Sequence, residues 1–215
     1  MKIALRGKKE IIQEWSNIVS SGQVIKEFKS IDSSLNLNDF DVVFDLDFEN
    51  HPQDAAHYLN LNCKVFLSSV CVNLYEYFPK EEVYGINALP TMIGRKLLEI
   101  CGTKGESEEV TDLVKKLGWE APEWVDCRAG LVTPRIICMI INEAYYTVQE
   151  GTANREDIDK GMKLGTAYPK GPFEWSKEIG ITNVYKVLEA MYKDTQEERY
   201  KICPLLKKEY LQERS

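Results

Sequence analysis

The run TPRIICMIINEAYYTV, residues 133–148, divides this chain into two kinds of sequence. Its apolar residues recur at three- and four-residue intervals, as on one face of a helix. Thr133 offers an N-cap hydroxyl and Pro134 suits the first helical position, so we expect one long helix that Gly151 ends. Before this run β-like segments alternate with helical ones, whereas every long segment after it has helical periodicity. The sequence therefore predicts two domains of different class, residues 1–128 and 129–215.

The domain over residues 1–128 is predicted to be an α/β domain. β-like segments cover residues 2–6, 23–28, 41–45, 64–67 and 83–87. Helical segments are expected at residues 10–19, 53–60 and 107–117. Strands that alternate with helices favour a parallel sheet.

The domain over residues 129–215 is predicted to be entirely helical. Asn154 and Asp157 are spaced as in a capping box and predict a helix over 155–164, with Gly165 in the C′ position. Further helices are expected at residues 181–192 and 204–212.

Composition and charge exclude several classes of protein. The chain has 215 residues, with 27 Lys and Arg against 34 Asp and Glu, so its net charge of −7 should repel nucleic acids and anionic lipids. Its apolar runs are far shorter than the roughly 20 residues of a membrane span. The six cysteines form no CxxC pair and no signal peptide is recognisable, so we expect buried, reduced thiols in a soluble cytoplasmic protein. Two histidines and scattered cysteines predict no metal site.

A series of short motifs runs through residues 130–210. They are Gly130-Leu-Val, Asn142-Glu-Ala144, Glu150-Gly151, Glu156-Asp-Ile-Asp159, Met162-Lys-Leu-Gly165, Pro169-Lys-Gly-Pro-Phe-Glu174 and Gly180. In order and spacing they resemble the C-terminal helical domain of the 3-hydroxyacyl-CoA dehydrogenase family. The alternative is that these residues only punctuate an ordinary helical bundle. Because this domain forms the dimer in many family members, the resemblance implies a homodimer through residues 129–215.

Fainter matches extend the resemblance towards the N-terminus. Residues 41–45, followed by Glu49, look like the strand region beside the nicotinamide cofactor, and Ser68 falls in the family's Asn-Thr-Ser-Ser stretch. The resemblance implies a Rossmann-like fold for residues 1–128. That domain is truncated here, because only twelve residues separate Phe28 from Asp41, where the family has a long helical excursion that helps to hold CoA.

The resemblance implies NAD-linked oxidation of a 3-hydroxyacyl-CoA to a 3-oxoacyl-CoA. In the family a histidine takes the proton of the substrate hydroxyl, and a glutamate orients and charges that histidine. Here Glu99 holds the glutamate position, but Asn87 holds the histidine position, and an amide cannot take that proton. Ser68 is the remaining hydroxyl. Three asparagine positions of the family fall on Phe66, Pro90 and Pro134.

The motif for the cofactor is also incomplete. Gly7 alone remains of the Gly-x-Gly-x-x-Gly loop, which lets a backbone approach the pyrophosphate of NAD closely. Glu27, twenty residues after Gly7, is placed to meet a ribose hydroxyl, although a charged residue after a second strand is commonplace. By resemblance, Asp45 and Glu49 would lie beside the nicotinamide.

Two functional hypotheses remain open. The first is a dehydrogenase of 3-hydroxybutyryl-CoA type, in fatty acid metabolism, with impaired or lost activity. The alternative is a non-catalytic paralogue that acts as a dimeric binding or assembly subunit. His51 and His57 are candidate displaced bases, but solvated surface histidines are the simpler interpretation. Cys71 lacks a histidine partner, so we expect a buried thiol rather than a nucleophile.

Overall fold

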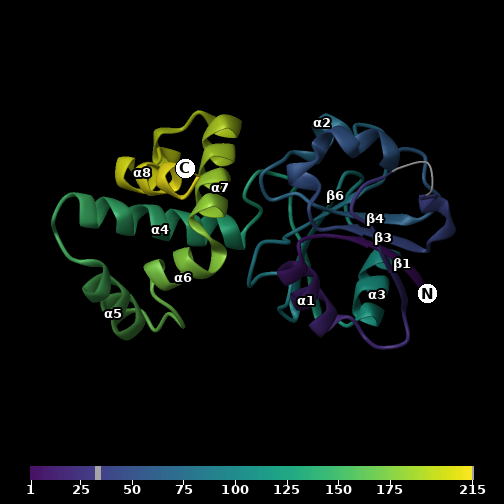
Figure 1. The fold of residues 1–215 in the computed structure, drawn as a ribbon, viewed down its shortest axis with the longest axis horizontal. Helices are drawn as coiled ribbons and strands as arrows, with labels where there is room; N and C mark the ends of the chain where they lie inside the picture. Colours follow the sequence, from purple (N-terminus) through teal and green to yellow (C-terminus); the bar gives the residue numbers. More distant parts are fainter. Residues whose placement is uncertain (32–34, 215) are drawn as a thin grey trace. The chain divides into compact units, whose positions relative to one another are not determined.

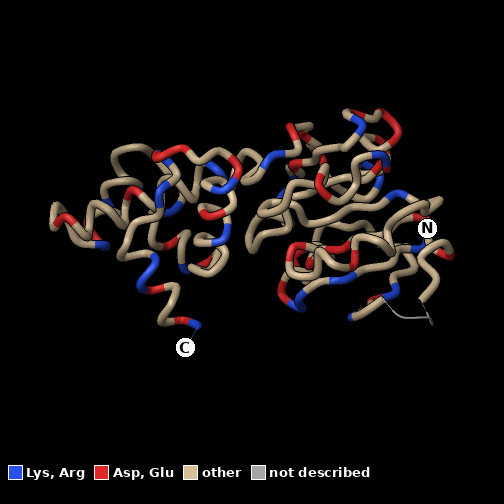
Figure 2. The backbone as a smooth tube through the Cα atoms, turned by 90° about the horizontal axis from the view of Figure 1, so that it is seen from above, with Lys and Arg blue, Asp and Glu red and all other residues tan. Residues whose placement is uncertain are grey.

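The computed structural model describes residues 1–31 and 35–214 and divides into two compact units, Met1–Leu131 and Val132–Ser215. The first unit contains a sheet, and the second consists of helices (Figure 1). Acidic and basic residues are interspersed along both units (Figure 2). No helix within the described ranges is long and apolar enough to cross a bilayer.

The first unit is built on a seven-stranded sheet with the order β2-β1-β3-β4-β5-β6-β7. The strands are β1 (Lys2–Arg6), β2 (Val24–Glu27), β3 (Val42–Asp45), β4 (Lys64–Ser68), β5 (Tyr84–Ile86), β6 (Leu97–Gly102) and β7 (Ala121–Trp124). The strands from β2 to β5 are parallel, β6 runs antiparallel to β5, and β7 is parallel to β6. The predicted α/β class with a mostly parallel Rossmann-like sheet is confirmed.

Helices cover both faces of this sheet. They are α1 (Lys9–Ile18), α2 (Leu74–Tyr77) and α3 (Glu108–Leu117), with short 3-10 turns η1 (Leu37–Asp39), η2 (Phe48–Asn50) and η3 (Pro52–Tyr58). Figure 1 shows α1 and α3 on one face and α2 on the other. The Ser107 side chain caps α3, whose buried face carries Val110, Val114 and Leu117. The helix expected at 53–60 is the 3-10 segment η3, and its last residue, Tyr58, is buried rather than at the surface.

Aromatic side chains fill the core between the sheet and α1 with α3. Phe44 of β3 stacks on Phe66 of β4 with ring centroids 4.7 Å apart, and Trp15 of α1 meets Phe44 edge-on at 5.3 Å. All three rings are completely buried. Because large aromatic rings bury much apolar area, they fix the spacing of the central strands.

The sequence did not predict β6 or β7. Residues of β6 after Leu97 are buried on both faces, so the strand lacks the polar and apolar alternation that marks a half-exposed strand. β7 contains Pro122, which a sheet tolerates at an edge, and β7 is an edge strand.

The second unit is a helical bundle. Its elements are α4 (Thr133–Gln149), α5 (Arg155–Gly165), α6 (Pro172–Ile179), α7 (Ile181–Thr195), η4 (Glu198–Tyr200) and α8 (Pro204–Glu213). Asn154 caps α5 as predicted, and Gly151 follows α4 with a φ of 74°. Three details differ from the expectation. The sequence did not predict α6. Val132, not Thr133, is the N-cap of α4, and Gly165 is the last residue of α5, so that the left-handed conformation falls on Ala167.

The family-like motifs form the joints of this bundle. Asp159 of α5 accepts hydrogen bonds from the backbone N–H of Phe173, at 2.8 Å, and of Glu174, at 3.2 Å, at the start of α6. A Cβ on Gly171 would overlap the Asp159 carboxylate, so only glycine fits there. The Asn142 side chain donates to the Lys201 carbonyl and accepts from the Cys203 N–H, each at 2.9 Å. These motifs hold helices together.

The structure joins Cys101 of β6 to Cys127 in a disulfide, with Cα atoms 5.1 Å apart. The expectation of reduced thiols is therefore wrong for this pair, because the strand order that brings Cys127 back beside β6 was not visible in the sequence. Cys138 and Cys203 are buried free thiols, whereas Cys71 is half-buried.

Candidate functional site

Three predicted site residues gather at the neighbouring ends of β4, β5 and β6. Ser68 ends β4 opposite Ile86, and Asn87 directly follows β5. The antiparallel register sets Asn87 opposite Glu99, and the Asn87 N–H donates to the Glu99 carbonyl over 3.4 Å. Ser68, Asn87 and Glu99 are at most 4% exposed. Asn87 and Glu99 thus form a buried polar cluster, and Ser68 ends the neighbouring strand.

The side chain of Asn87 limits what this cluster can do chemically. Its Oδ1 accepts a hydrogen bond from the Leu89 N–H at 3.3 Å. Its Nδ2 is buried and has no hydrogen-bond partner among the residues that the structure describes. An amide nitrogen has no lone pair for a proton, so Asn87 supplies no general base.

Arg95 is a charged neighbour of this cluster that the sequence did not single out. Burial lowers the pKa of Arg95 from its ordinary value, and the negative charge of Glu99 opposes that shift. The Arg95 Nε also donates to the Met92 carbonyl at 3.3 Å. The charges of Glu99 and Arg95 therefore attract one another. Only the fold could reveal this, because nothing in the sequence distinguishes Arg95 from a solvated charge.

Phe66 adds no polar group to the cluster. Its ring is fully buried, stacked on Phe44 and 5.4 Å from the Tyr84 ring. Pro134, another aligned position, lies in the first turn of α4 in the second unit. Neither position can contribute the asparagine amide that the resemblance implies.

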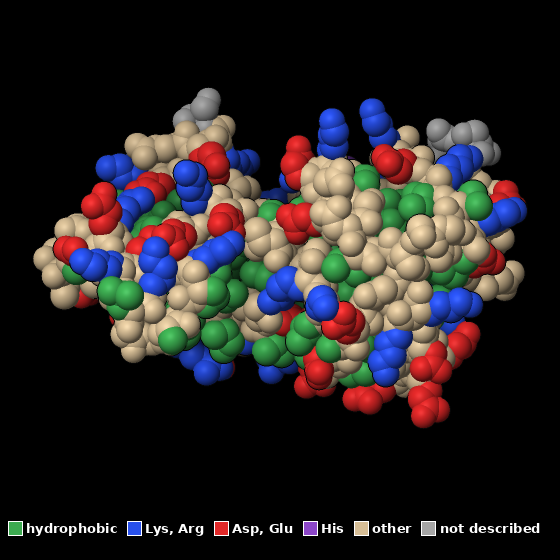
Figure 3. Space-filling view, turned by 90° about the horizontal axis from the view of Figure 1, so that it is seen from below, with side chains coloured by type: hydrophobic (Ala, Val, Ile, Leu, Met, Phe, Trp, Pro, Cys, Tyr) green, Lys and Arg blue, Asp and Glu red, His purple; other side chains and the backbone are tan. Residues whose placement is uncertain are grey.

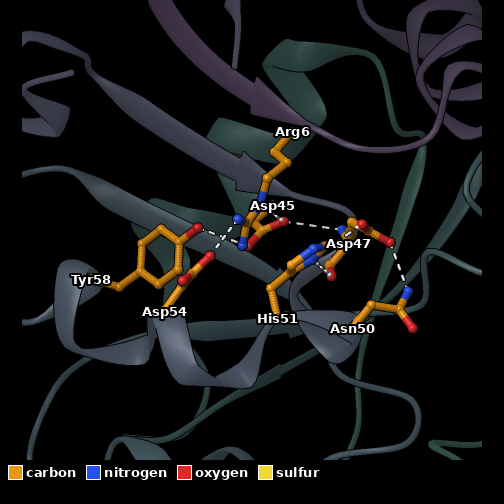
Figure 4. A network of polar contacts seen from close by, with 7 residues as sticks. All are labelled: Arg6, Asp45, Asp47, Asn50, His51, Asp54 and Tyr58. Atoms are coloured by element: carbon orange, nitrogen blue, oxygen red, sulfur yellow. Dashed lines mark hydrogen bonds and ion pairs between the residues drawn. The ribbon is translucent and has the colours of Figure 1, made fainter. Parts of the chain in front are cut away.

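The candidate cofactor residues lie at the carboxyl ends of β1 and β3, where Arg6 pairs with Asp45 (Figure 4). The Arg6 Nε donates to Asp45 Oδ1 at 2.9 Å, and its Nη2 contacts Asp45 Oδ2. Tyr58 donates its hydroxyl to Asp45 Oδ2 at 2.7 Å. Both carboxylate oxygens of Asp45 therefore bind side chains of the protein itself, Arg6 and Tyr58. The sequence did not predict these contacts.

Glu49 and Gly7 also have structural partners. Glu49 accepts the backbone N–H of Cys71 at 2.7 Å. A Cβ on Gly7 would lie 3.1 Å from the Leu46 Cβ and 3.2 Å from the Ile12 Cγ1, so Gly7 serves close packing of the chain between β1 and α1. Glu27 is exposed at the end of β2, beside Leu5 in register.

The histidines lie in the segment after β3, His51 between η2 and η3 and His57 within η3. The Nδ1 of His51 lies 3.2 Å from a carboxylate oxygen of Asp47, and His57 is exposed. Within the described residues, no group of three or more His, Cys, Asp or Glu side chains is arranged to hold a metal ion.

Comparison with known proteins identifies the family of the helical unit. Residues 130–214 match the 3-hydroxyacyl-CoA dehydrogenase C-terminal domain. This part of the chain is therefore a 3-hydroxyacyl-CoA dehydrogenase C-terminal domain. This range includes Asn142 and Asp159, whose side chains hold helices of the bundle together.

Two curated relatives and one crystal structure give the extent of the likeness. A probable 3-hydroxybutyryl-CoA dehydrogenase of Bacillus subtilis is 37% identical over 127 residues, which cover 57% of this chain and 43% of that protein. The chain thus matches less than half of that relative's length. A 3-hydroxybutyryl-CoA dehydrogenase of Clostridioides difficile is 26% identical over 202 residues. That alignment covers 88% of this chain and 72% of that protein.

The crystal structure of (S)-3-hydroxybutyryl-CoA dehydrogenase PaaH1 from Ralstonia eutropha shares the fold. It superposes with a TM-score of 0.73 at 20% identity, covering 96% of this chain and 92% of that one.

The 3-hydroxyacyl-CoA dehydrogenase family uses NAD, but the residues at the crevice of this chain do not fit a dinucleotide. Gly7 is the first position of the glycine loop, and the second and third positions are Lys9 and Ile12. Ile12 packs against the core, where the third glycine would allow close packing of helix and strand. The buried Arg6 and Asp45 side chains lie at the strand ends that would face the pyrophosphate.

Proposed function

We propose that this chain is a 3-hydroxyacyl-CoA dehydrogenase-like protein in which NAD-linked oxidation of 3-hydroxyacyl-CoA is impaired or lost. The observation that carries the proposal is the amide of Asn87 opposite Glu99. Hydride transfer from the substrate carbon requires removal of the proton from its hydroxyl, and a positioned base raises such rates by roughly a hundred- to ten-thousand-fold. The position from which the family supplies that base holds a side chain that cannot accept a proton.

Neither Arg95 nor Ser68 compensates for the missing base. The neighbouring cation, Arg95, stays protonated near neutral pH and cannot act as a base. Ser68 offers a hydroxyl, which needs a base itself before it can accept a proton. We expect a rate at least about a hundred-fold below that of an active family member.

The test is a direct assay of the reverse reaction. Purified protein is mixed with NADH and acetoacetyl-CoA, and NADH absorbance is followed against a blank without protein. The Bacillus subtilis relative, a probable 3-hydroxybutyryl-CoA dehydrogenase, is the positive control. We expect no oxidation above the blank. Turnover close to that of the control, abolished by Glu99→Gln, would contradict the proposal.

A second role, as a dimeric assembly or binding subunit in cytoplasmic fatty acid metabolism, is favoured by apolar exposure on the helical unit. Ile136 of α4 is 56% exposed, and the half-buried Met139 and Ile140 follow it at helical spacing. Apolar side chains also reach the surface of this unit among charged ones in Figure 3. A contiguous apolar strip of this kind is typical of a protein interface.

Light scattering after gel filtration tests the assembly role. We expect a mass twice the 24.7 kDa of one chain. Ile136→Glu should reduce it to that of a single chain, because a charge in a buried apolar interface is costly. Lys160→Glu, at an exposed position of α5, is the matched control and should leave the mass unchanged. A wild-type protein of single-chain mass would exclude the homodimer.

A further inference from the structure

The crevice where a doubly wound sheet binds its ligand can be located from the strand order. In such sheets the ligand lies beyond the carboxyl ends of the strands, where the order reverses. Here the chain passes from β1 to β2 on one side and then to β3 on the other side of β1, so the reversal lies between β1 and β3. Arg6 is the last residue of β1 and Asp45 the last of β3, and the two are paired in register.

The Arg6 side chain at this point is fully engaged. It is 3% exposed and makes a two-pronged contact with Asp45, and its Nη1 lies 2.5 Å from Asp54 Oδ2. The Phe28 ring, just beyond the end of β2, lies 5.7 Å from the guanidinium. Burial opposes the charge of Arg6, but the hydrogen bonds to Asp45 and Asp54 outweigh this and raise its pKa above the ordinary value. The guanidinium therefore stays charged at every physiological pH.

The partners of Asp45 complete the network that Figure 4 shows. Its Oδ1 accepts the Asp47 N–H at 3.0 Å, and its Oδ2 accepts the Tyr58 hydroxyl at 2.7 Å. Asp45 is fully buried, and burial together with the Asp45 charge raises the pKa of Tyr58. The carboxylate thus holds elements from β1, β3 and η3 around one buried charge.

We propose that the Arg6–Asp45 ion pair closes the dinucleotide crevice of this chain, so that the α/β unit folds around its own buried ion pair and excludes NAD. The inference deepens the proposed function, on which it rests, by extending the loss from the base to the cofactor. This closure is more than the absence of the loop glycines, because the side chains of Arg6 and Asp45 occupy the place where NAD would bind.

Charge and burial both resist opening of this crevice. Moving Arg6 aside would leave Asp45 buried without its counter-ion, which is among the costliest changes in a protein interior. An incoming pyrophosphate would also meet the carboxylates of Asp47 and Asp54, whose side chains are 17% and 22% exposed. The negative charges of the pyrophosphate and of these carboxylates would repel one another strongly in a partly buried site.

Binding of the cofactor to the wild-type protein is the primary test. NADH and NAD⁺ are titrated to 5 mM, on the order of a physiological excess, and NADH fluorescence and the melting temperature are followed. We expect no saturable signal and a shift below about 1 °C, whereas a site occupied at a hundred times its Kd would raise the melting temperature by roughly 5–10 °C. Saturable binding within this concentration range would overturn the proposal.

Variants of the pair test whether it holds the unit together. Arg6→Met should lower the melting temperature by roughly 10 °C, and Arg6→Met with Asp45→Asn should recover at least half of that loss, because both charges are then removed. Arg199→Met is the matched control, since it removes an arginine from a surface ion pair with Glu197. A loss for Arg6→Met no larger than for Arg199→Met would overturn the proposal, and an Arg6→Met chain that does not fold, when the double variant does, would support it.

Binding and turnover are measured separately, so the two proposals fail in different ways. Saturable NADH binding without oxidation of NADH would overturn the closed crevice and leave the missing base standing. Oxidation of NADH with acetoacetyl-CoA would overturn the proposed loss of activity itself.

Discussion

Asn87 lies opposite Glu99 where β5 meets the antiparallel strand β6, and the Asn87 N–H donates to the Glu99 carbonyl. By resemblance, these two positions are those of the family's histidine and glutamate. Residues opposite one another on antiparallel strands have Cβ atoms roughly 4.5–5.5 Å apart, close enough for their side chains to interact. The register thus places these two positions where their side chains can interact, and of the two residues only Asn87 departs from what the resemblance implies.

Asn87→His tests whether the base alone limits activity. The imidazole would stand opposite Glu99, but with the crevice closed by Arg6 and Asp45 we expect no gain in NADH oxidation over Asn87→Ala, the matched control. The measurement is the assay with NADH and acetoacetyl-CoA. A gain of about a hundred-fold, the contribution of a positioned base, would show that the cofactor binds and would overturn the closed crevice.

Asp159 holds the start of α6 through two backbone N–H groups. Asp159→Ala should lower the free energy of unfolding by about 1–2 kcal/mol, because it leaves the N-terminal N–H groups of α6 without their carboxylate acceptor. Gly171→Ala should cost about 1–3 kcal/mol, since its Cβ would overlap the same carboxylate. Lys160→Ala, at an exposed site of α5, should stay within about 0.5 kcal/mol of wild type. Urea unfolding measures the free energy of unfolding of all three variants. A loss for Asp159→Ala no larger than that for Lys160→Ala would contradict the capping role.

Asn142 joins α4 to the chain before α8 through the Lys201 carbonyl and the Cys203 N–H. Asn142→Ala should destabilise the helical unit by about 1–3 kcal/mol, because the buried Cys203 N–H loses its partner. Glu143→Ala, at the next and exposed residue, is the control and should have little effect. Chemical denaturation followed by circular dichroism gives both values. A loss below about 1 kcal/mol for Asn142→Ala would show that water replaces the side chain.

The Cys101–Cys127 disulfide closes a loop with a sequence separation of 26 residues. On chain entropy, a bridge of this span contributes about 3–4 kcal/mol. Because two of the six cysteines form the bridge, protein oxidised with glutathione disulfide and then unfolded should react with iodoacetamide at four thiols. After reduction it should react at all six.

The buried thiol of Cys138 offers an internal standard for that experiment. Burial raises the pKa of Cys138 to about 12, so in the folded protein near neutral pH it stays a thiol and should not be alkylated. The half-buried Cys71 should react faster. Mass spectrometry of digested protein locates each label, and six reactive thiols in the oxidised, unfolded protein would exclude the bridge.

Local signals in the sequence predicted the helical unit well. The cap of α5 needs only Asn154 and Asp157, and the end of α4 needs only Gly151, because each interaction joins residues within one turn. β6 escaped prediction for the opposite reason. Its burial comes from neighbours on both faces of the sheet, and Glu99 in its middle looks like a solvated charge until the fold buries it to 4% exposure.

The sequence by itself determined the α/β and helical classes of the two units, the order of strands β1 to β5, and the side chain at the position that by resemblance holds the family's histidine. Only the tertiary structure decided that Arg6 meets Asp45, that the charge of Glu99 acts on Arg95, and that Cys101 reaches Cys127. The first and last of these pairs join residues 39 and 26 positions apart. Such contacts depend on strand order and register, which bring distant residues together with a geometry that no local pattern encodes.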